Sequence, residues 1–164
     1  STNRRISMYV ISQDQDMKFI QTNTVTKNNI KSWISKYKSL NDVIDIFDAT
    51  IVNFGIEFSI VSGASYNSNF VISNAISRLK EYFDDMLYIG EPIYLNSIWN
   101  VLNKVDGVVD VKRVKVFNKS SAGYSTNVLD FDDILSKDGT YIKTPKNVIM
   151  EIKYPNLDIK GIIK

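Results

Sequence analysis

The chain of 164 residues is long enough for one domain, or for one domain with a small appendage. Its formal net charge of +2 argues against a strongly basic nucleic-acid-binding domain. Cysteine and histidine are absent, which excludes disulfides, zinc–thiolate sites, cysteine nucleophiles and histidine general bases. The longest apolar runs contain only a few residues, far fewer than the roughly 20 needed to cross a bilayer.

The N-terminal residues 1–49 are predicted to form a small lobe that is separate from residues 50–164. Apolar residues alternate with other side chains over residues 6–11, which predicts a strand. Residues 13–16 are polar and turn-prone, so we expect residues 17–21 to return as the second strand of a hairpin.

A helix is expected after this hairpin, with Thr26 or Asn28 as its N-cap. Its apolar stripe at helical spacing comprises Ile30, Trp33, Ile34 and Tyr37. The segment 41–49 suits either a short helix or a strand. As a helix it would place three acidic residues on one face, namely Asp42, Asp45 and Asp48.

Residues 51–86 carry the clearest signals in the chain. Residues 51–61 alternate strictly and predict a strand with one apolar face, formed by Val52, Phe54, Ile56, Phe58 and Ile60. Residues 70–86 then predict a helix with Ser68 or Asn69 as N-cap. Its apolar stripe comprises Ile72, Ala75, Ile76, Leu79, Phe83 and Met86.

The next segments predict a helix with a defined end and a strand with a bulge. A third helix, with an apolar face of Leu95, Ile98, Trp99, Leu102 and Val105, is expected to end at Gly107 in a left-handed conformation. Residues 108–117 predict the next strand, but its apolar positions change from odd (Val109, Val111) to even (Val114, Val116). A slip of one residue predicts a β-bulge near Lys112-Arg113.

The last third is expected to contain a loop, a turn and a final strand. Residues 118–127 are rich in Ser, Asn and Gly and predict a mobile surface loop. A turn is expected at Asp138-Gly139, and residues 148–154 predict the last strand, followed by an apolar tail. This order of elements predicts an α+β fold with two helices packed on one face of a mainly antiparallel sheet.

Carboxylates are the only acid–base groups in good supply. Asp84 and Asp85 lie near the end of the long predicted helix, and the three Asp residues of segment 41–49 would share a face if that segment were helical. A glycosidase or a metal-dependent nuclease uses such groups. The ordinary surface frequency of Asp favours a solvated helix face or turn.

Two further charged segments invite a functional reading. An EF-hand loop that starts at Asp130 requires Gly at its sixth position, where this chain has Leu135, so a turn with a short acidic helix is favoured instead of a calcium site. The basic segment 112–115 suits phosphate binding. Lysines that guard an edge strand against aggregation explain the same residues, and this account is favoured because no aromatic residues are interleaved for base stacking. We therefore predict no catalytic, cofactor-binding or metal-binding residues.

Four segments together resemble the C-terminal domain of baseplate wedge proteins from contractile-tailed phages. They are the strand 51–61, the helix 70–86, the extended segment 89–94 (Ile-Gly-Glu-Pro-Ile-Tyr) and residues 105–111 (Val-Asp-Gly-Val-Val-Asp-Val). The pattern is similar to the broader baseplate J-like family. Residues 4–48 are similar to the region just before this domain. Because the chain begins with Ser1, we expect a piece of a longer protein.

This resemblance implies a structural role without chemistry. In that family the domain pairs with a neighbouring copy and helps to close a ring around the tail hub. The implied partners are other baseplate proteins and copies of this chain as a homodimer, with no cofactor, membrane or nucleic acid, in a virion tail baseplate assembled in the host cytoplasm. The interface candidates are Val114, Val116, Leu157, Ile159, Ile162 and Ile163.

Two other classes remain open. A carboxylate or metal-dependent hydrolase requires at least two acidic groups that converge in a pocket. A nucleic-acid-binding module requires Lys and Arg residues to gather on one face. The apolar tail has two interpretations as well, because it either supplies surface for a neighbour or adds a last strand to the sheet.

Overall fold

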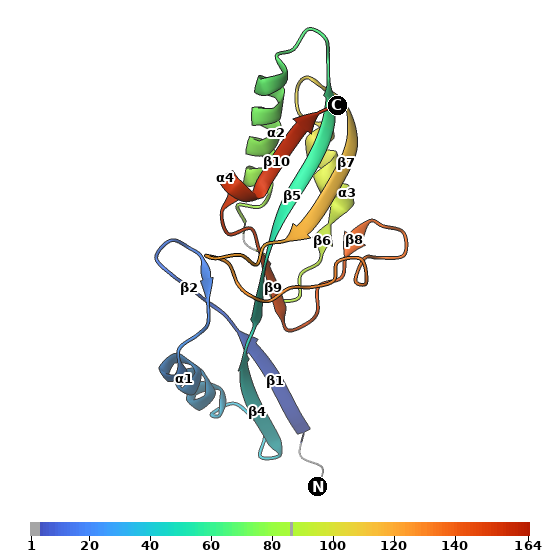
Figure 1. The fold of residues 1–164 in the computed structure, drawn as a ribbon. Coiled ribbons are helices and arrows are strands. Elements are labelled where there is room, and N and C mark those ends of the chain that lie inside the picture. Colours follow the sequence, from blue (N-terminus) through green and yellow to red (C-terminus); the bar gives the residue numbers. More distant parts are fainter. Residues whose placement is uncertain (1–3, 86) are drawn as a thin grey trace. The chain divides into compact units, whose positions relative to one another are not determined.

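The computed structural model describes residues 4–85 and 87–164. These residues form an α+β fold with four helices and several small sheets, as predicted (Figure 1). The chain divides into two compact units, Ser1–Ile51 (unit 1) and Val52–Lys164 (unit 2).

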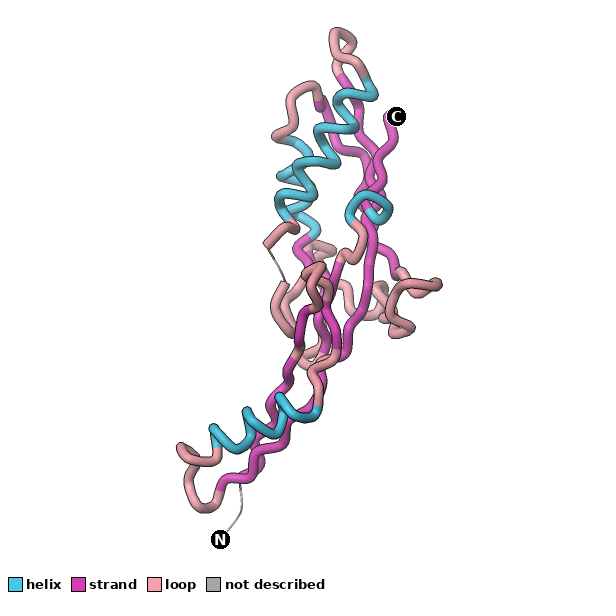
Figure 2. The backbone as a smooth tube through the Cα atoms, turned by 90° about the vertical axis from the view of Figure 1, so that its left-hand side faces the viewer, coloured by secondary structure: helices cyan, strands magenta, loops and turns pink. Residues whose placement is uncertain are grey.

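Unit 1 is built around two parallel strands. β1 (Arg4–Val10) pairs with β4 (Asp42–Asp48) one residue to one residue, from Arg4 opposite Asp42 to Val10 opposite Asp48. Parallel strands cannot be joined by a tight turn and need a crossover connection. The intervening chain supplies it and contains α1 (Thr24–Ile34), which runs beside the strands (Figure 2).

The predicted N-terminal hairpin is present only in part. Its turn is confirmed, since the Asp14 carboxylate accepts hydrogen bonds from the amides of Asp16 and Lys18 at 2.9 Å. The paired strands are only β2 (Ser12–Gln13) and β3 (Phe19–Ile20). The prediction that residues 6–11 pair with 17–21 is wrong, because the apolar positions of β1 find their partners on β4.

α1 differs from its prediction at both ends. The N-cap is Asn23, whose side-chain oxygen accepts the Thr26 amide at 2.8 Å, and not Thr26 or Asn28. The helix ends at Ile34, so Tyr37 lies outside it. Trp33 is 60% exposed, and no residue of α1 is fully buried. A sheet of two strands is too narrow to cover the predicted apolar stripe.

Unit 2 has β5 (Thr50–Ser62) at its centre. The main sheet has the order β10–β5–β7, and β9 also pairs with β5. The predicted apolar face of β5 is confirmed, since Val52, Phe54, Ile56, Phe58 and Ile60 are all buried. They form the core with residues of α2 (Ser68–Tyr82) and α3 (Leu95–Asn103), which lie on one side of the sheet (Figures 1 and 2).

α2 begins and ends earlier than predicted. Its N-cap is Asn67, which accepts the amides of Asn69 and Phe70, and its last residue is Tyr82. The fully buried residues are Val71, Ala75 and Leu79, so the buried line lies at one edge of the predicted stripe. The predicted stripe residue Met86 lies outside the described residues.

The remaining elements of unit 2 are β6 (Ile93–Tyr94), β7 (Val108–Asn118), β8 (Tyr141–Ile142), β9 (Val148–Glu151), α4 (Pro155–Asp158) and β10 (Ile159–Ile163). β7 runs antiparallel to β5, but β10 runs parallel to it. The main sheet is therefore mixed, so the prediction of a mainly antiparallel sheet is confirmed only in part. The apolar tail is confirmed as an added strand.

The predicted bulge in β7 is confirmed. Ser59 lies opposite Arg113, but the next residue, Ile60, lies opposite Val111, so Lys112 is the extra residue. The change of apolar phase in the sequence therefore reports a real change of register, because one inserted residue exchanges the faces of a strand.

Gly107 has the left-handed conformation predicted for it, although α3 ends earlier, at Asn103, and Gly139 also has a positive φ. Gly107 has φ +89° and Gly139, in the confirmed turn after Asp138, has φ +70°. A methyl group on Gly107 would lie 2.7 Å from Val71 and 2.8 Å from Tyr66, whereas a methyl group on Gly139 would meet no atom within 4 Å. Gly107 thus combines a backbone requirement with a steric one.

This difference gives a test with a built-in control. Gly139→Ala should cost about 1 kcal/mol of unfolding free energy, from left-handed backbone strain alone, and Gly107→Ala roughly 2–4 kcal/mol. Urea unfolding followed by Trp99 fluorescence, in a Trp33→Phe background, measures both. Equal losses for the two variants would contradict the steric account.

Candidate assembly surface

The main sheet has one face that the helices do not cover. In the register of the sheet, Glu57 of β5 lies between Lys115 of β7 and Lys160 of β10, and Ser59 lies between Arg113 and Ile162. We call these residues the open face. The core residues of β5 point the other way, towards α2 and α3. Figure 1 looks onto the open face, with both helices behind the sheet.

The open face is mostly exposed and charged, although Ser59 is buried. Glu57, Arg113, Lys115 and Lys160 are exposed, and Ile162 is 60% exposed. Three cations thus surround one carboxylate beside an apolar side chain. This arrangement brings part of the basic segment 112–115 together with a lysine distant in sequence, which the sequence alone did not indicate.

The predicted interface residues fall into two groups. Val116 and Ile159 are buried in the core, and Val114 and Ile163 are partly buried against it. In the folded monomer these four side chains offer little surface to a neighbour. Leu157 and Ile162 are 62% and 60% exposed and do offer it. The apolar tail therefore adds a last strand and still leaves two side chains exposed, and within β10 alternate residues point into the core and away from it.

The loop after β7 is anchored by a buried carboxylate. Asp158, at the end of α4, is completely buried. Its Oδ1 accepts a hydrogen bond from the Tyr124 hydroxyl at 2.6 Å and lies 3.4 Å from the Lys119 ammonium, and its Oδ2 accepts the Tyr154 amide at 2.9 Å. A buried carboxylate requires such compensation by cations and donors. We call these four residues the Asp158 cluster.

A second buried pair holds the same loop. The Asn53 side chain donates to Glu151 at 2.9 Å and accepts the Ser125 amide at 2.7 Å, and the Asn53 carbonyl accepts the Lys119 amide at 2.9 Å. Residues 118–127 were predicted to be a mobile surface loop, but these contacts attach them to β5 and α4. Residue type alone does not predict these contacts, since Asn and Asp are common on exposed surfaces as well.

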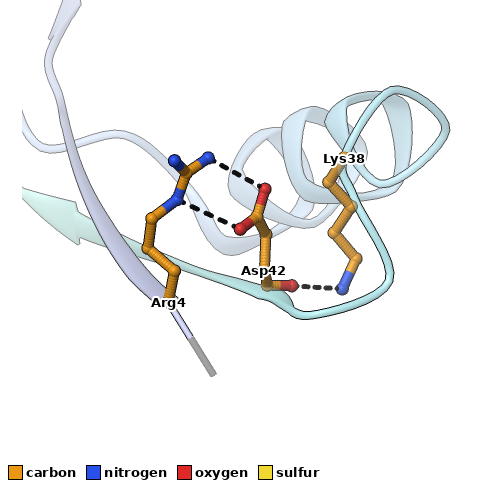
Figure 3. A network of polar contacts seen from close by, with 3 residues as sticks. All are labelled: Arg4, Lys38 and Asp42. Carbon is orange, nitrogen blue, oxygen red and sulfur yellow. Dashed lines mark hydrogen bonds and ion pairs between the residues drawn. The ribbon is translucent and has the colours of Figure 1, made fainter. Parts of the chain in front are cut away.

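The predicted acidic helix face in unit 1 does not exist, because residues 42–48 form β4. Each of its three Asp residues instead pairs with a cation: Asp42 with Arg4 at 3.1 Å, Asp45 with Arg5 at 3.1 Å, and Asp48 with Lys27 at 2.8 Å. Figure 3 shows the Arg4 guanidinium forked over the Asp42 carboxylate, while Lys38 donates to the Asp42 carbonyl. These three ion pairs link β4 to β1 and to α1.

The other acidic segments form turns. Asp84 and Asp85 are exposed and lie beyond the end of α2. Asp130 begins a turn in which its carboxylate accepts the amides of Asp132 and Asp133, and the predicted short acidic helix is absent from this segment. Hydrogen bonds to the Asp138 carboxylate, first from Ser136 and then from Thr140, lower its pKa.

A groove of about 380 Å³ lies between α2 and the turn after α3. Two acids, Glu81 and Asp106, and two cations, Arg78 and Lys104, are among its lining residues, and Arg78 pairs with Glu81 at 2.9 Å. The carboxylates of this groove are therefore balanced by cations and do not form a converging acidic pair.

Residues 4–85 and 87–164 contain neither a cluster of metal ligands nor a membrane-spanning helix. No group of three or more acidic side chains in this part of the chain is arranged to hold a metal ion. None of its helices has the length and apolar character required to span a membrane.

The two groups of interface candidates should respond differently to truncation. Ile159→Ala should lower the unfolding free energy by about 2–5 kcal/mol, because it leaves a cavity in the core. Ile162→Ala, on the same strand but 60% exposed, should cost about 1 kcal/mol or less. Urea unfolding of both variants checks this, and similar losses would show that the open face is covered in solution.

Tyr124 should make the protein sensitive to alkali. Burial, and then the hydrogen bond to Asp158 and its charge, raise the pKa of Tyr124 to about 12. An unfolded tyrosine titrates near pH ~10, so the stability contributed by this proton is complete below that pH and is lost as the pH rises towards the folded pKa. The unfolding free energy should therefore fall more steeply above pH ~10 in the wild type than in Tyr124→Phe. Parallel pH profiles of the two proteins would contradict this assignment.

Comparison with known proteins yields no relative: no protein-family model matches this chain, and no curated protein sequence matches it either.

Proposed function

We propose that this protein is a non-catalytic structural component of a contractile-phage tail baseplate and mediates subunit contacts in a wedge or ring. The observation that carries the proposal is the number of large apolar side chains that are exposed in both units. The most exposed are Leu40, Tyr37, Tyr88, Val25, Val109, Phe70, Leu157, Met17, Trp33 and Ile162. Adjacent members of this set, such as Trp33 and Tyr37 with ring centroids 5.0 Å apart, form apolar surface of the kind that partner proteins bind.

The resemblance of segments within residues 51–111 to baseplate wedge proteins supplies the biological setting. In this proposal residues 50–164, with two helices against one face of the sheet, are the assembly domain, and residues 1–49 are an accessory lobe. The partners are other baseplate proteins and a second copy of the chain, and the site of action is the virion tail after assembly in the host cytoplasm.

The ion pairs of the candidate carboxylates support a role without chemistry. A hydrolase needs at least two acidic groups free to bind a metal or to transfer protons. In unit 1 the clustered carboxylates each pair with a cation at 3.1 Å or less. The groove in unit 2 mixes acids with cations. The hydrolase therefore remains the weaker alternative.

A nucleic-acid-binding module is the second candidate, and the open face is the observation that favours it. Arg113, Lys115 and Lys160 gather there, as that function requires. Glu57 lies within the same row, however, and the nearby Lys112 pairs with Asp110 at 2.5 Å. These carboxylates dilute the positive field that would attract a phosphate backbone.

The proposal is tested by the mass of the protein in solution, measured by light scattering during size exclusion over a concentration series. We expect the average mass to rise with concentration from one chain to two, because closed two-fold pairs are the commonest assembly. A strict monomer at every concentration would contradict self-association. Salt-sensitive binding of a labelled oligonucleotide by such a monomer would favour the nucleic-acid reading.

A further inference from the structure

Unit 1 leaves its sheet unfinished. β1 and β4 pair only with each other among the described residues. Parallel sheets are normally buried and multi-stranded, and a two-stranded sheet has little stability in water by itself. Its buried apolar residues are few, namely Phe19, Ile44 and Ala49. Such a sheet is a template for the addition of another strand.

The free edge of β1 can be located from two hydrogen bonds. The Arg4 amide donates to the Asn41 carbonyl at 3.0 Å, and the Val10 carbonyl accepts the Ala49 amide at 2.9 Å. Both bonds reach the segment that contains β4. Because the N–H and C=O of one residue point to the same side of a strand and the side alternates, the even residues of β1 bond towards β4. The odd residues, Arg5, Ser7 and Tyr9, therefore direct their backbone groups to the free edge.

The sequence of β1 is suited to pairing with itself. In an antiparallel pair of two β1 strands centred on Ser7, Ile6 lies opposite Met8 and Arg5 lies opposite Tyr9. Apolar residues thus meet each other, and each guanidinium meets an aromatic ring, which is a favourable pairing. In this register the hydrogen-bonded pairs are Ser7 with Ser7 and Arg5 with Tyr9. This agrees with the backbone, because the N–H and C=O groups of the odd residues point to the free edge.

The edge of β4 is not suited to the same pairing. Antiparallel self-pairing centred on Asp45 would place Asp45 opposite its copy and Asp42 opposite Asp48. Carboxylates directly opposite each other destabilise a sheet. The two edges of this sheet therefore differ: pairing centred on the middle residue places like charges opposite each other at β4 but not at β1.

We propose that β1 of one chain pairs antiparallel with β1 of a second chain, about a two-fold axis at Ser7, to give a four-stranded sheet of order β4–β1–β1–β4. This rests on the proposed function, since it identifies which surface joins two copies. The new sheet also carries one exposed aromatic pair from each chain on the same face. Tyr9, 37% exposed, and Phe47, 46% exposed, contact each other at 5.8 Å on one face of each unit.

The absence of cysteine from the chain makes a direct test possible. Ser7→Cys introduces a single thiol with almost no change of shape. In the proposed register the two Cα atoms of residue 7 lie about 5.5 Å apart, within the range that a disulfide spans. Val10→Cys is a control. In the proposed register the Cα atoms of residue 10 in the two chains lie six residues apart along the ladder, ~20 Å, and a disulfide cannot join them. Ser65→Cys, an exposed position in unit 2, controls for collisional oxidation.

Mild oxidation of the three variants, at a concentration where the wild type is dimeric, is followed by mass and by non-reducing electrophoresis. Near-complete conversion of Ser7→Cys to a disulfide dimer, with little conversion of either control, is expected. Equal conversion of all three variants, or none, while the wild type remains dimeric would overturn the β1 pairing and leave the proposed assembly role intact. A wild type that is monomeric at every concentration would overturn both.

Discussion

The pairing of β5 with its neighbours is the constraint on which unit 2 depends. This strand has 13 residues, and β7, β9 and β10 all pair with it. Its even side chains supply the centre of the core against α2 and α3, while Glu57 on the other face meets solvent. A strand that bears the core on one face and charge on the other determines which side the helices must cover. The open face remains uncovered because α2 and α3 both pack on the opposite side of the sheet.

Polar interactions determine the position of the loop after β7. The buried Asp158 gathers Lys119, Tyr124 and Tyr154, while Asn53 reaches the same loop from β5. Each polar atom of such a cluster must be compensated because it is removed from water, so the cluster permits few alternative loop positions. A segment rich in Ser, Gly and Asn is held close to the sheet by this network, and its composition alone suggested mobility.

The two units differ in how complete their apolar cores are. Unit 2 has a core to which α2, α3 and the six strands β5 to β10 contribute. Unit 1 relies on ion pairs between β1, α1 and β4, and leaves aromatic side chains such as Trp33 and Phe47 exposed. Partly exposed ion pairs contribute little to stability compared with apolar burial. Of the two units, the smaller one thus has the less complete core.

The sequence by itself determined the features that depend on neighbours along the chain. The faces of β5, the bulge at Lys112, the turn at Gly139 and the α+β class could all be read from periodicity and residue type. The parallel pairing of β1 with β4, the parallel return of the last strand and the burial of Asp158 were decided only by tertiary structure. Alternation shows that a strand has an apolar face, but it does not show which distant strand will cover or extend it. For the same reason, the candidate surface could be predicted only as separate apolar and basic segments, because strand register alone brings Arg113 and Ile162 onto one face.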